Sequence, residues 1–103
     1  MEGGGLRVKV VLASIYREAA GVKELDLNLP EGATLRDLLL KLAELYGGPF
    51  TRLMAEDGSI SRDALLFVNG MSLRDASSKL KEGDFVFIAS ENVEAEASFI
   101  KNK

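Results

Sequence analysis

Leu29-Pro30-Glu31-Gly32-Ala33-Thr34-Leu35-Arg36-Asp37-Leu38 is the stretch that decides the fold, because it joins the end of a strand to the start of a helix. Pro30-Glu31-Gly32 breaks the strand. Thr34 can cap the free N–H groups of a first helical turn, and Asp37 stands where the acid of a capping box belongs. The stretch therefore predicts a strand–turn–helix unit, with the helix ending at Gly47-Gly48-Pro49. Its apolar face, at three- and four-residue spacing, comprises Leu35, Leu38, Leu39, Leu42 and Tyr46.

Strands are predicted on both sides of this unit. Residues 6–13 and 23–29 alternate apolar and polar side chains, as strands with one buried face do. Residues 64–68 and 85–89 are apolar throughout. Asn69-Gly70 is a tight-turn signal that leads into a short returning strand at 71–73. Together these elements predict a single small α+β domain.

The connecting segments carry weaker signals. Residues 16–21 are predicted to form a loop, and residues 50–55 are compatible with a short helical turn. Glu56-Asp57-Gly58 and Lys81-Glu82-Gly83-Asp84 predict turns. Residues 75–80 are predicted to form a turn of helix.

Composition limits what the chain can do. The 103 residues are 47% hydrophobic, enough for one core, which we assign to residues 6–89 between a flexible N-terminus (1–5) and a C-terminal extension (90–103). There is no Cys and no His, which excludes zinc fingers, thiol nucleophiles and triads that use imidazole. The net charge of −3 comes without a basic stripe, so nucleic acid is not an expected partner.

No stretch approaches the roughly 20 apolar residues that span a bilayer. No signal peptide is recognisable either, so we expect a cytoplasmic protein without a membrane partner. Acid pairs such as Glu24/Asp26 and Glu56/Asp57 lack the dense spacing of a calcium loop and are interpreted as solvated. We predict no catalytic, cofactor-binding or metal-ligating residue, and therefore no enzyme.

Five short motifs follow one another along residues 6–89. They are the pair Val8-Lys9-Val10 and Arg17-Glu18, the stretch at 29–38, Glu56-Asp57-Gly58, Val68-Asn69-Gly70 and Leu80-Lys81-Glu82-Gly83-Asp84. In this order, and joined by this strand and helix pattern, the chain resembles the MoaD/ThiS sulfur carriers.

The resemblance implies a ubiquitin-like β-grasp fold, a mixed sheet packed on one main helix. It also implies a substrate of enzymes rather than an enzyme. In that family an ATP-dependent activating enzyme adenylates the C-terminal carboxylate, and the resulting thiocarboxylate delivers sulfur to molybdopterin, thiamine or another acceptor. Some relatives are attached to proteins instead. The partners implied are an activating enzyme or the large subunit of a molybdopterin synthase.

Members of that family end in Gly-Gly, because the tail threads a narrow channel where a Cβ would collide. Glu94 and Ala95 stand at these positions here, and no glycine follows Gly83. This favours a role in protein recognition, related to sulfur transfer or molybdopterin cofactor synthesis. Two alternatives stay open: a covalent sulfur carrier or protein modifier activated at an atypical C-terminus, and a noncovalent interaction module unrelated to sulfur.

The apolar strands at 64–68 and 85–89 also predict a contact surface. If Val86 and Ile88 face the helix, the alternate side chains face away from it and form an apolar patch larger than a monomer usually exposes. Coverage by residues 90–103, or a reversed register, would remove this surface. Self-association through this face or through the tail is a further expectation. The candidate partner-binding residues are Val11, Phe67, Phe85 and Phe87.

Overall fold

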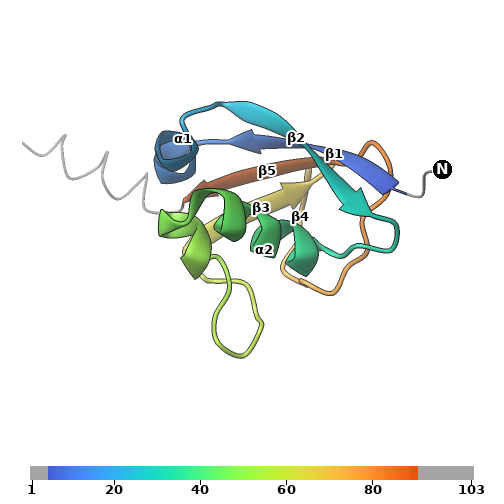
Figure 1. The fold of residues 1–103 in the computed structure, drawn as a ribbon. Helices are drawn as coiled ribbons and strands as arrows, with labels where there is room; N and C mark the ends of the chain where they lie inside the picture. The colour runs from blue at the N-terminus through green and yellow to red at the C-terminus, as the bar shows by residue number, and fades with distance from the viewer. Residues whose placement is uncertain (1–4, 91–103) are drawn as a thin grey trace, which may run out of the picture.

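An antiparallel hairpin of β1 (Gly5–Leu12) and β2 (Glu24–Pro30) starts the fold of the computed structural model, which describes residues 5–90 (Figure 1). The register places Val8 opposite Leu27 and Val10 opposite Leu25. These apolar side chains face the core while the residues between them face solvent, which confirms the alternation predicted for both strands. β1 begins one residue earlier than predicted.

The segment between these strands corrects one prediction. Residues 16–21 do not form a loop, because α1 (Ser14–Ala20) is a short helix there. Its sequence contains good helix formers, and Gly21, with φ 78°, closes it by donating its N–H to the carbonyl of Arg17. The helix has no side-chain cap at Ala13, so the usual start signal was missing from the sequence. Burial of Tyr16 holds it in place.

The decisive stretch forms the predicted strand–turn–helix unit. α2 (Leu35–Tyr46) begins with a complete capping box: the Asp37 N–H donates to Thr34 Oγ1, and the Thr34 N–H donates to Asp37 Oδ2 at 2.9 Å. The helix ends at Gly47, as predicted. The 3-10 helix η1 (Gly48–Arg52) follows and confirms a helical turn near residue 50.

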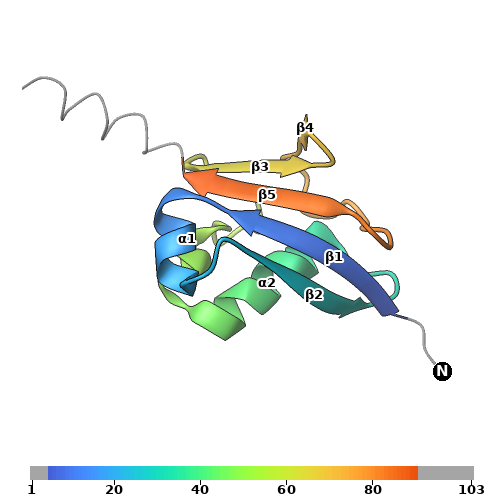
Figure 2. The ribbon, with the colours of Figure 1, turned by 90° about the horizontal axis from the view of Figure 1, so that it is seen from above.

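β3 (Ala64–Val68), β4 (Met71–Ser72) and β5 (Phe85–Ser90) complete a five-stranded sheet of order β2-β1-β5-β3-β4 (Figure 2). β5 runs parallel to β1 and antiparallel to β3, so the sheet is mixed. Asn69 and Gly70, with φ 53° and 87°, form the predicted turn between β3 and β4. This is the ubiquitin-like β-grasp fold that the sequence predicts.

Residues 75–80 correct a second prediction, since they contain a turn and no helix. The Asp75 carboxylate accepts hydrogen bonds from both the N–H and the hydroxyl of Ser77. Such local bonds give the backbone an alternative to helical bonding. The segment instead runs beside the start of α2, where the Leu35 and Arg36 N–H groups donate to the carbonyls of Ser78 and Ala76.

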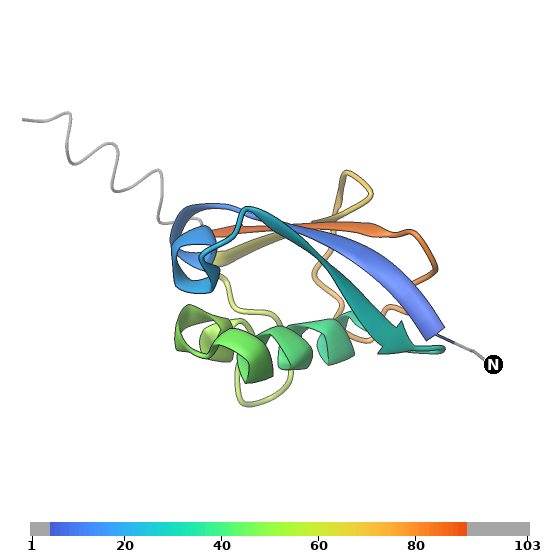
Figure 3. The same cartoon turned by 45° about the horizontal axis from the view of Figure 1, so that its top comes forward.

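The core lies between the sheet and α2, which covers one face only (Figure 3). The side chains that are at most 1% exposed include Val8, Val10, Leu66, Val86 and Ile88 from the sheet and Leu35, Leu38, Leu39 and Leu42 from the helix. Among residues 5–90, no helix has the length and apolar character needed to cross a membrane. Glu94, Ala95 and most of the predicted C-terminal extension lie outside the described residues.

Candidate protein-recognition site

The sheet face opposite α2 carries a row of apolar side chains. The first four residues of β5 alternate: Val86 and Ile88 are fully buried against the helix, so Phe85 and Phe87 lie on the outer face. A reversed register is therefore wrong for this strand. The alternative in which the C-terminal segment covers this face depends on residues 91–103, which lie outside the described residues.

Strand pairing aligns the candidate residues across three strands. Phe87 is paired with Val11 of β1 on one side and with Phe67 of β3 on the other. The Phe67 and Phe87 rings are tilted by 56°, with centroids 6.3 Å apart, a favourable aromatic arrangement. Phe85, opposite Lys9, extends the group along β5. We call Val11, Phe67, Phe85 and Phe87 the outer-face cluster.

The outer-face cluster is accessible within the described part of the chain. Phe85 is 40% exposed, and Val11, Phe67 and Phe87 are half-buried by their cross-strand neighbours. Half-buried Leu65 of β3, paired with Ala89 of β5, continues the apolar surface beyond the residues that the sequence predicted. Because these side chains stand on the central strands of a sheet, their positions are fixed before any partner arrives.

A charged rim borders the outer-face cluster on the β1–β2 side. Lys9 Nζ lies 3.5 Å from Glu24 Oε2, and Lys9 is also the cross-strand partner of Asp26. Since these groups are exposed, the ion pair adds little stability. Its position beside an apolar centre matches the usual anatomy of an interface, a polar rim around a hydrophobic core.

A part-buried polar network holds the start of β5 in place. Asp84 is only 5% exposed; its carboxylate accepts from Asn69 Nδ2 at 3.0 Å and from the Lys81 N–H at 2.8 Å. The Asn69 side-chain oxygen accepts from the Phe85 N–H, and the Asn69 N–H donates to the Phe85 carbonyl. The sequence predicted two separate turns here. The sequence did not predict the direct hydrogen bond between Asn69 and Asp84 that joins these turns. Its only sign in the sequence is a polar residue, Asp84, directly before an apolar strand.

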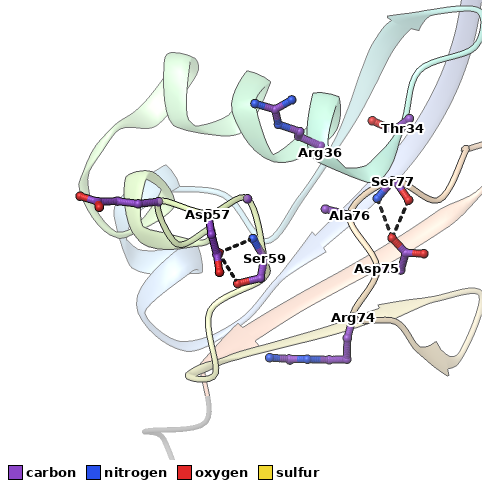
Figure 4. A pocket seen from close by; sticks show the side chains of 10 residues that line it. Thr34, Arg36, Asp57, Ser59, Arg74, Asp75, Ala76 and Ser77 are labelled. Carbon is purple, nitrogen blue, oxygen red and sulfur yellow. Dashed lines mark hydrogen bonds between the residues drawn. The ribbon is translucent and has the colours of Figure 1, made fainter.

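A hollow of about 670 Å³, lined mostly by residues with polar or charged side chains, lies beside the start of α2 (Figure 4). Its main groups are already engaged: the Arg74 guanidinium donates to the carbonyls of Ala64 and Ser61, both at 2.7 Å. Asp57 and Asp75 each accept two hydrogen bonds from the serine two residues later, which lowers the pKa of each carboxyl. These bonds organise the two loops, and we assign the hollow no ligand. Among residues 5–90, no group of three or more potential metal-binding side chains occurs.

Comparison with known families decides what kind of chain this is. The ThiS family model matches residues 10–88. The chain belongs to the ThiS family. It is therefore related to the small ubiquitin-like sulfur carriers and modifiers, as the motifs in its sequence predict.

Solved structures agree with this assignment. The putative molybdopterin converting factor subunit 1 of Pyrococcus furiosus is 30% identical, with a TM-score of 0.69, covering 82% of this chain and 97% of its own. The Haloferax volcanii HVO 2177 protein is 26% identical, with a TM-score of 0.79 and 88% of both chains covered. The small archaeal modifier protein 1 of Methanosarcina acetivorans is 27% identical, with a TM-score of 0.69 and coverage of 85% and 95%. No curated protein matches the sequence.

For this member of the ThiS family, the structure brings all four candidate residues onto one face. Their role in partner binding stays a prediction. The positions assigned to the family Gly-Gly, Glu94 and Ala95, lie beyond the described residues.

Proposed function

We propose that this ThiS-family chain acts by being bound, in sulfur transfer or molybdopterin-type cofactor synthesis, with the outer-face cluster as its docking surface. The partner would be an activating enzyme of the adenylating type or the large subunit of a molybdopterin synthase. The single observation that carries the proposal is the row Val11–Phe87–Phe67, which is aligned across three central strands and only half-buried.

The chemistry of this row supports recognition. Aromatic side chains dominate the energy of protein interfaces, and the central ones contribute most when water is excluded around them. Phe67 and Phe87 support each other through their tilted rings, so little conformational entropy is lost when they are covered. Lys9 and Glu24 beside them supply a polar rim that can fix the orientation of the partner.

Recognition, rather than chemistry on this chain, is the favoured role for two reasons. The described residues offer no nucleophile beside a general base. Glu94 and Ala95, assigned to the Gly-Gly positions, carry side chains that a narrow active-site channel would reject. The fold would then present a surface, and the partner would perform the reaction.

The proposal is tested with the full chain and the adenylating enzyme encoded in the same genome. Isothermal titration in the presence of ATP compares the wild type with Phe87→Glu. Burying an unpaired charge at the centre of an interface should weaken binding by about thirty-fold or more. The matched control is Leu45→Glu on α2, a half-exposed leucine on the helix side of the molecule, which should bind normally.

Two results would count against this function. If Phe87→Glu binds as tightly as the wild type while keeping its folded circular dichroism spectrum, the outer-face cluster is not the docking surface. If Phe87→Glu unfolds the domain, Phe87 belongs to the core instead. Light scattering on the same samples separates partner binding from self-association through this face.

A covalent carrier is the second candidate, favoured by the family match over residues 10–88. In that reaction the terminal carboxylate attacks ATP, forms an acyl adenylate and releases pyrophosphate; sulfide then displaces AMP and leaves a thiocarboxylate. Intact mass measurement after incubation with the adenylating enzyme, ATP and sulfide would detect the replacement of oxygen by sulfur. An unchanged mass, together with tight binding, supports recognition alone, whereas a thiocarboxylate establishes the carrier.

A further inference from the structure

One edge of the sheet exposes backbone groups that have no strand beside them in the described part of the chain. β2 is the first strand in the order β2-β1-β5-β3-β4. The Leu12 N–H donates to the Lys23 carbonyl, so every second residue from Lys23 points its backbone groups at β1. The N–H and C=O groups of Glu24, Asp26 and Asn28 therefore point outward, and Pro30 ends the row without a donor.

A groove runs beside this edge, between β2 and α2. It has a volume of about 640 Å³ and its lining is mainly apolar. Leu40, on the exposed side of α2, is 46% exposed and forms part of its wall. The other lining residues are Asn28, Leu29, Pro30, Asp37, Lys41, Ala43 and Glu44.

The two sides of the edge differ in chemistry. Glu24 and Asp26 project from β2 to the outer face of the sheet, where their exposed carboxylates flank the open backbone groups and share one cation, Lys9, which lies 3.5 Å from Glu24. On the groove side, Leu40 and Ala43 offer apolar contact, bordered by two acids and one base, Asp37, Glu44 and Lys41. A strand placed against β2 would send alternate side chains to these two environments.

This charge pattern selects the occupant. A second copy of the chain pairing its own β2 here would bring Glu24 and Asp26 close to the same carboxylates, and like charges across strands are unfavourable. An extended segment with alternating basic and apolar residues has the opposite character. Its basic side chains would lie beside Asp26 and Glu24, and its apolar side chains would enter the groove against Leu40.

We propose that the β2 edge and the groove beside α2 form a second docking site, which adds an extended segment of a partner protein as a sixth strand. The segment alternates Lys or Arg with apolar residues, and main-chain hydrogen bonds to Asp26 and Asn28 supply much of its affinity. This site is separate from the outer-face cluster, which lies on β1, β5 and β3, so the inference does not depend on the proposed function.

Charged side chains and a terminal proline also protect sheet edges from unwanted pairing. That role alone predicts that no peptide binds, whereas the docking site predicts binding that depends on alternation and charge. Peptides with the same residues in a different order therefore distinguish the protective role from the docking role.

The probe is the synthetic peptide acetyl-Lys-Val-Lys-Val-Lys-Val-Lys-amide, titrated into the full ¹⁵N-labelled chain. We expect a Kd tighter than about 1 mM, the weakest affinity that supports specific recognition at accessible concentrations. Bound peptide should slow hydrogen exchange at the amides of Asp26 and Asn28 about ten-fold or more, because these N–H groups become bonded. The block-order peptide acetyl-Lys-Lys-Lys-Lys-Val-Val-Val-amide and the Glu-Val alternating peptide are the controls.

Three variants at the β2 edge and its groove, and one control on the outer face, locate the site. Asp26→Lys reverses the rim charge and should weaken binding about five-fold or more, in line with cross-strand charge pairs. Leu40→Glu should weaken peptide binding, because it places a charge in the groove wall that the apolar side chains of the peptide would contact. Asn28→Pro removes one outward N–H donor without removing a bond to β1, and it should weaken peptide binding. The control Phe87→Glu, on the outer-face cluster, should leave peptide binding unchanged.

Several results would overturn the inference. The alternating peptide could fail to bind with a Kd tighter than about 1 mM. The block-order peptide could bind as tightly as the alternating one. Protection from hydrogen exchange could appear at amides other than those of Asp26 and Asn28. The β2 edge would also be rejected if Asp26→Lys and Asn28→Pro, both shown to be folded by their ¹⁵N spectra, bind the peptide as tightly as the wild type does.

Discussion

Replacing Asp84, the residue directly before β5, by alanine should cost more stability than the same change at an exposed carboxylate. The carboxylate is 5% exposed and accepts hydrogen bonds from Asn69 Nδ2 and from the Lys81 N–H. A hydrogen bond to a charged group contributes about 1.5–3 kcal/mol. The two bonds are part-buried and the residues that donate them, Asn69 and Lys81, are exposed, so water offsets part of the loss and we expect roughly 2–4 kcal/mol in total. That is a large part of the 5–15 kcal/mol that holds a typical domain folded.

The assay is equilibrium unfolding in urea, followed by circular dichroism at pH 7. Asp75→Ala is the matched control: Asp75 also accepts two hydrogen bonds, from Ser77, but it is exposed, so water can replace them and the loss should be clearly smaller. The double variant with Asn69→Ala should show a positive coupling of about 1 kcal/mol. If Asp84→Ala is no more destabilising than Asp75→Ala, burial is not what makes this network important.

Three further predictions concern the core and its helix. Thr34→Ala removes the capping box of α2 and should lower the free energy of unfolding by about 1 kcal/mol, measured by urea unfolding. Leu42→Ala, at a position with 0% exposure, should cost about 3 kcal/mol in the same assay, while the half-exposed Leu45→Ala should cost far less. Burial raises the pKa of Tyr16, so the folded chain holds this proton more tightly than the unfolded chain; stability should fall as the pH rises above about 10, and less so in Tyr16→Phe.

Elements with strong local signals could be predicted from the sequence. The capping box at Thr34 and Asp37, the leucine spacing after it and the Asn69-Gly70 turn all specify their structure within a few residues. α1 was missed because it has no cap and because its stability comes from burial of Tyr16 against distant residues such as Phe50. Residues 75–80 were misassigned because Asp75 bonds to Ser77 rather than to a helix.

The candidate site was partly predictable for the same reason. Alternation along 85–89 placed Phe85 and Phe87 on one face, once Val86 and Ile88 were assigned to the core. Register between strands far apart in the sequence is not a local property, so the alignment of Val11 with Phe87 needed the structure. The Asn69–Asp84 bond, which joins two turns, was invisible for the same reason.

The central claim is that a partner binds the outer face of the sheet. Cross-saturation NMR measures this directly: the unlabelled adenylating enzyme is irradiated, and the loss of signal is read at each amide of the ¹⁵N,²H-labelled chain. We expect the largest losses at Val11, Phe67, Phe85 and Phe87. Largest losses along α2, with these four amides unaffected, would contradict it.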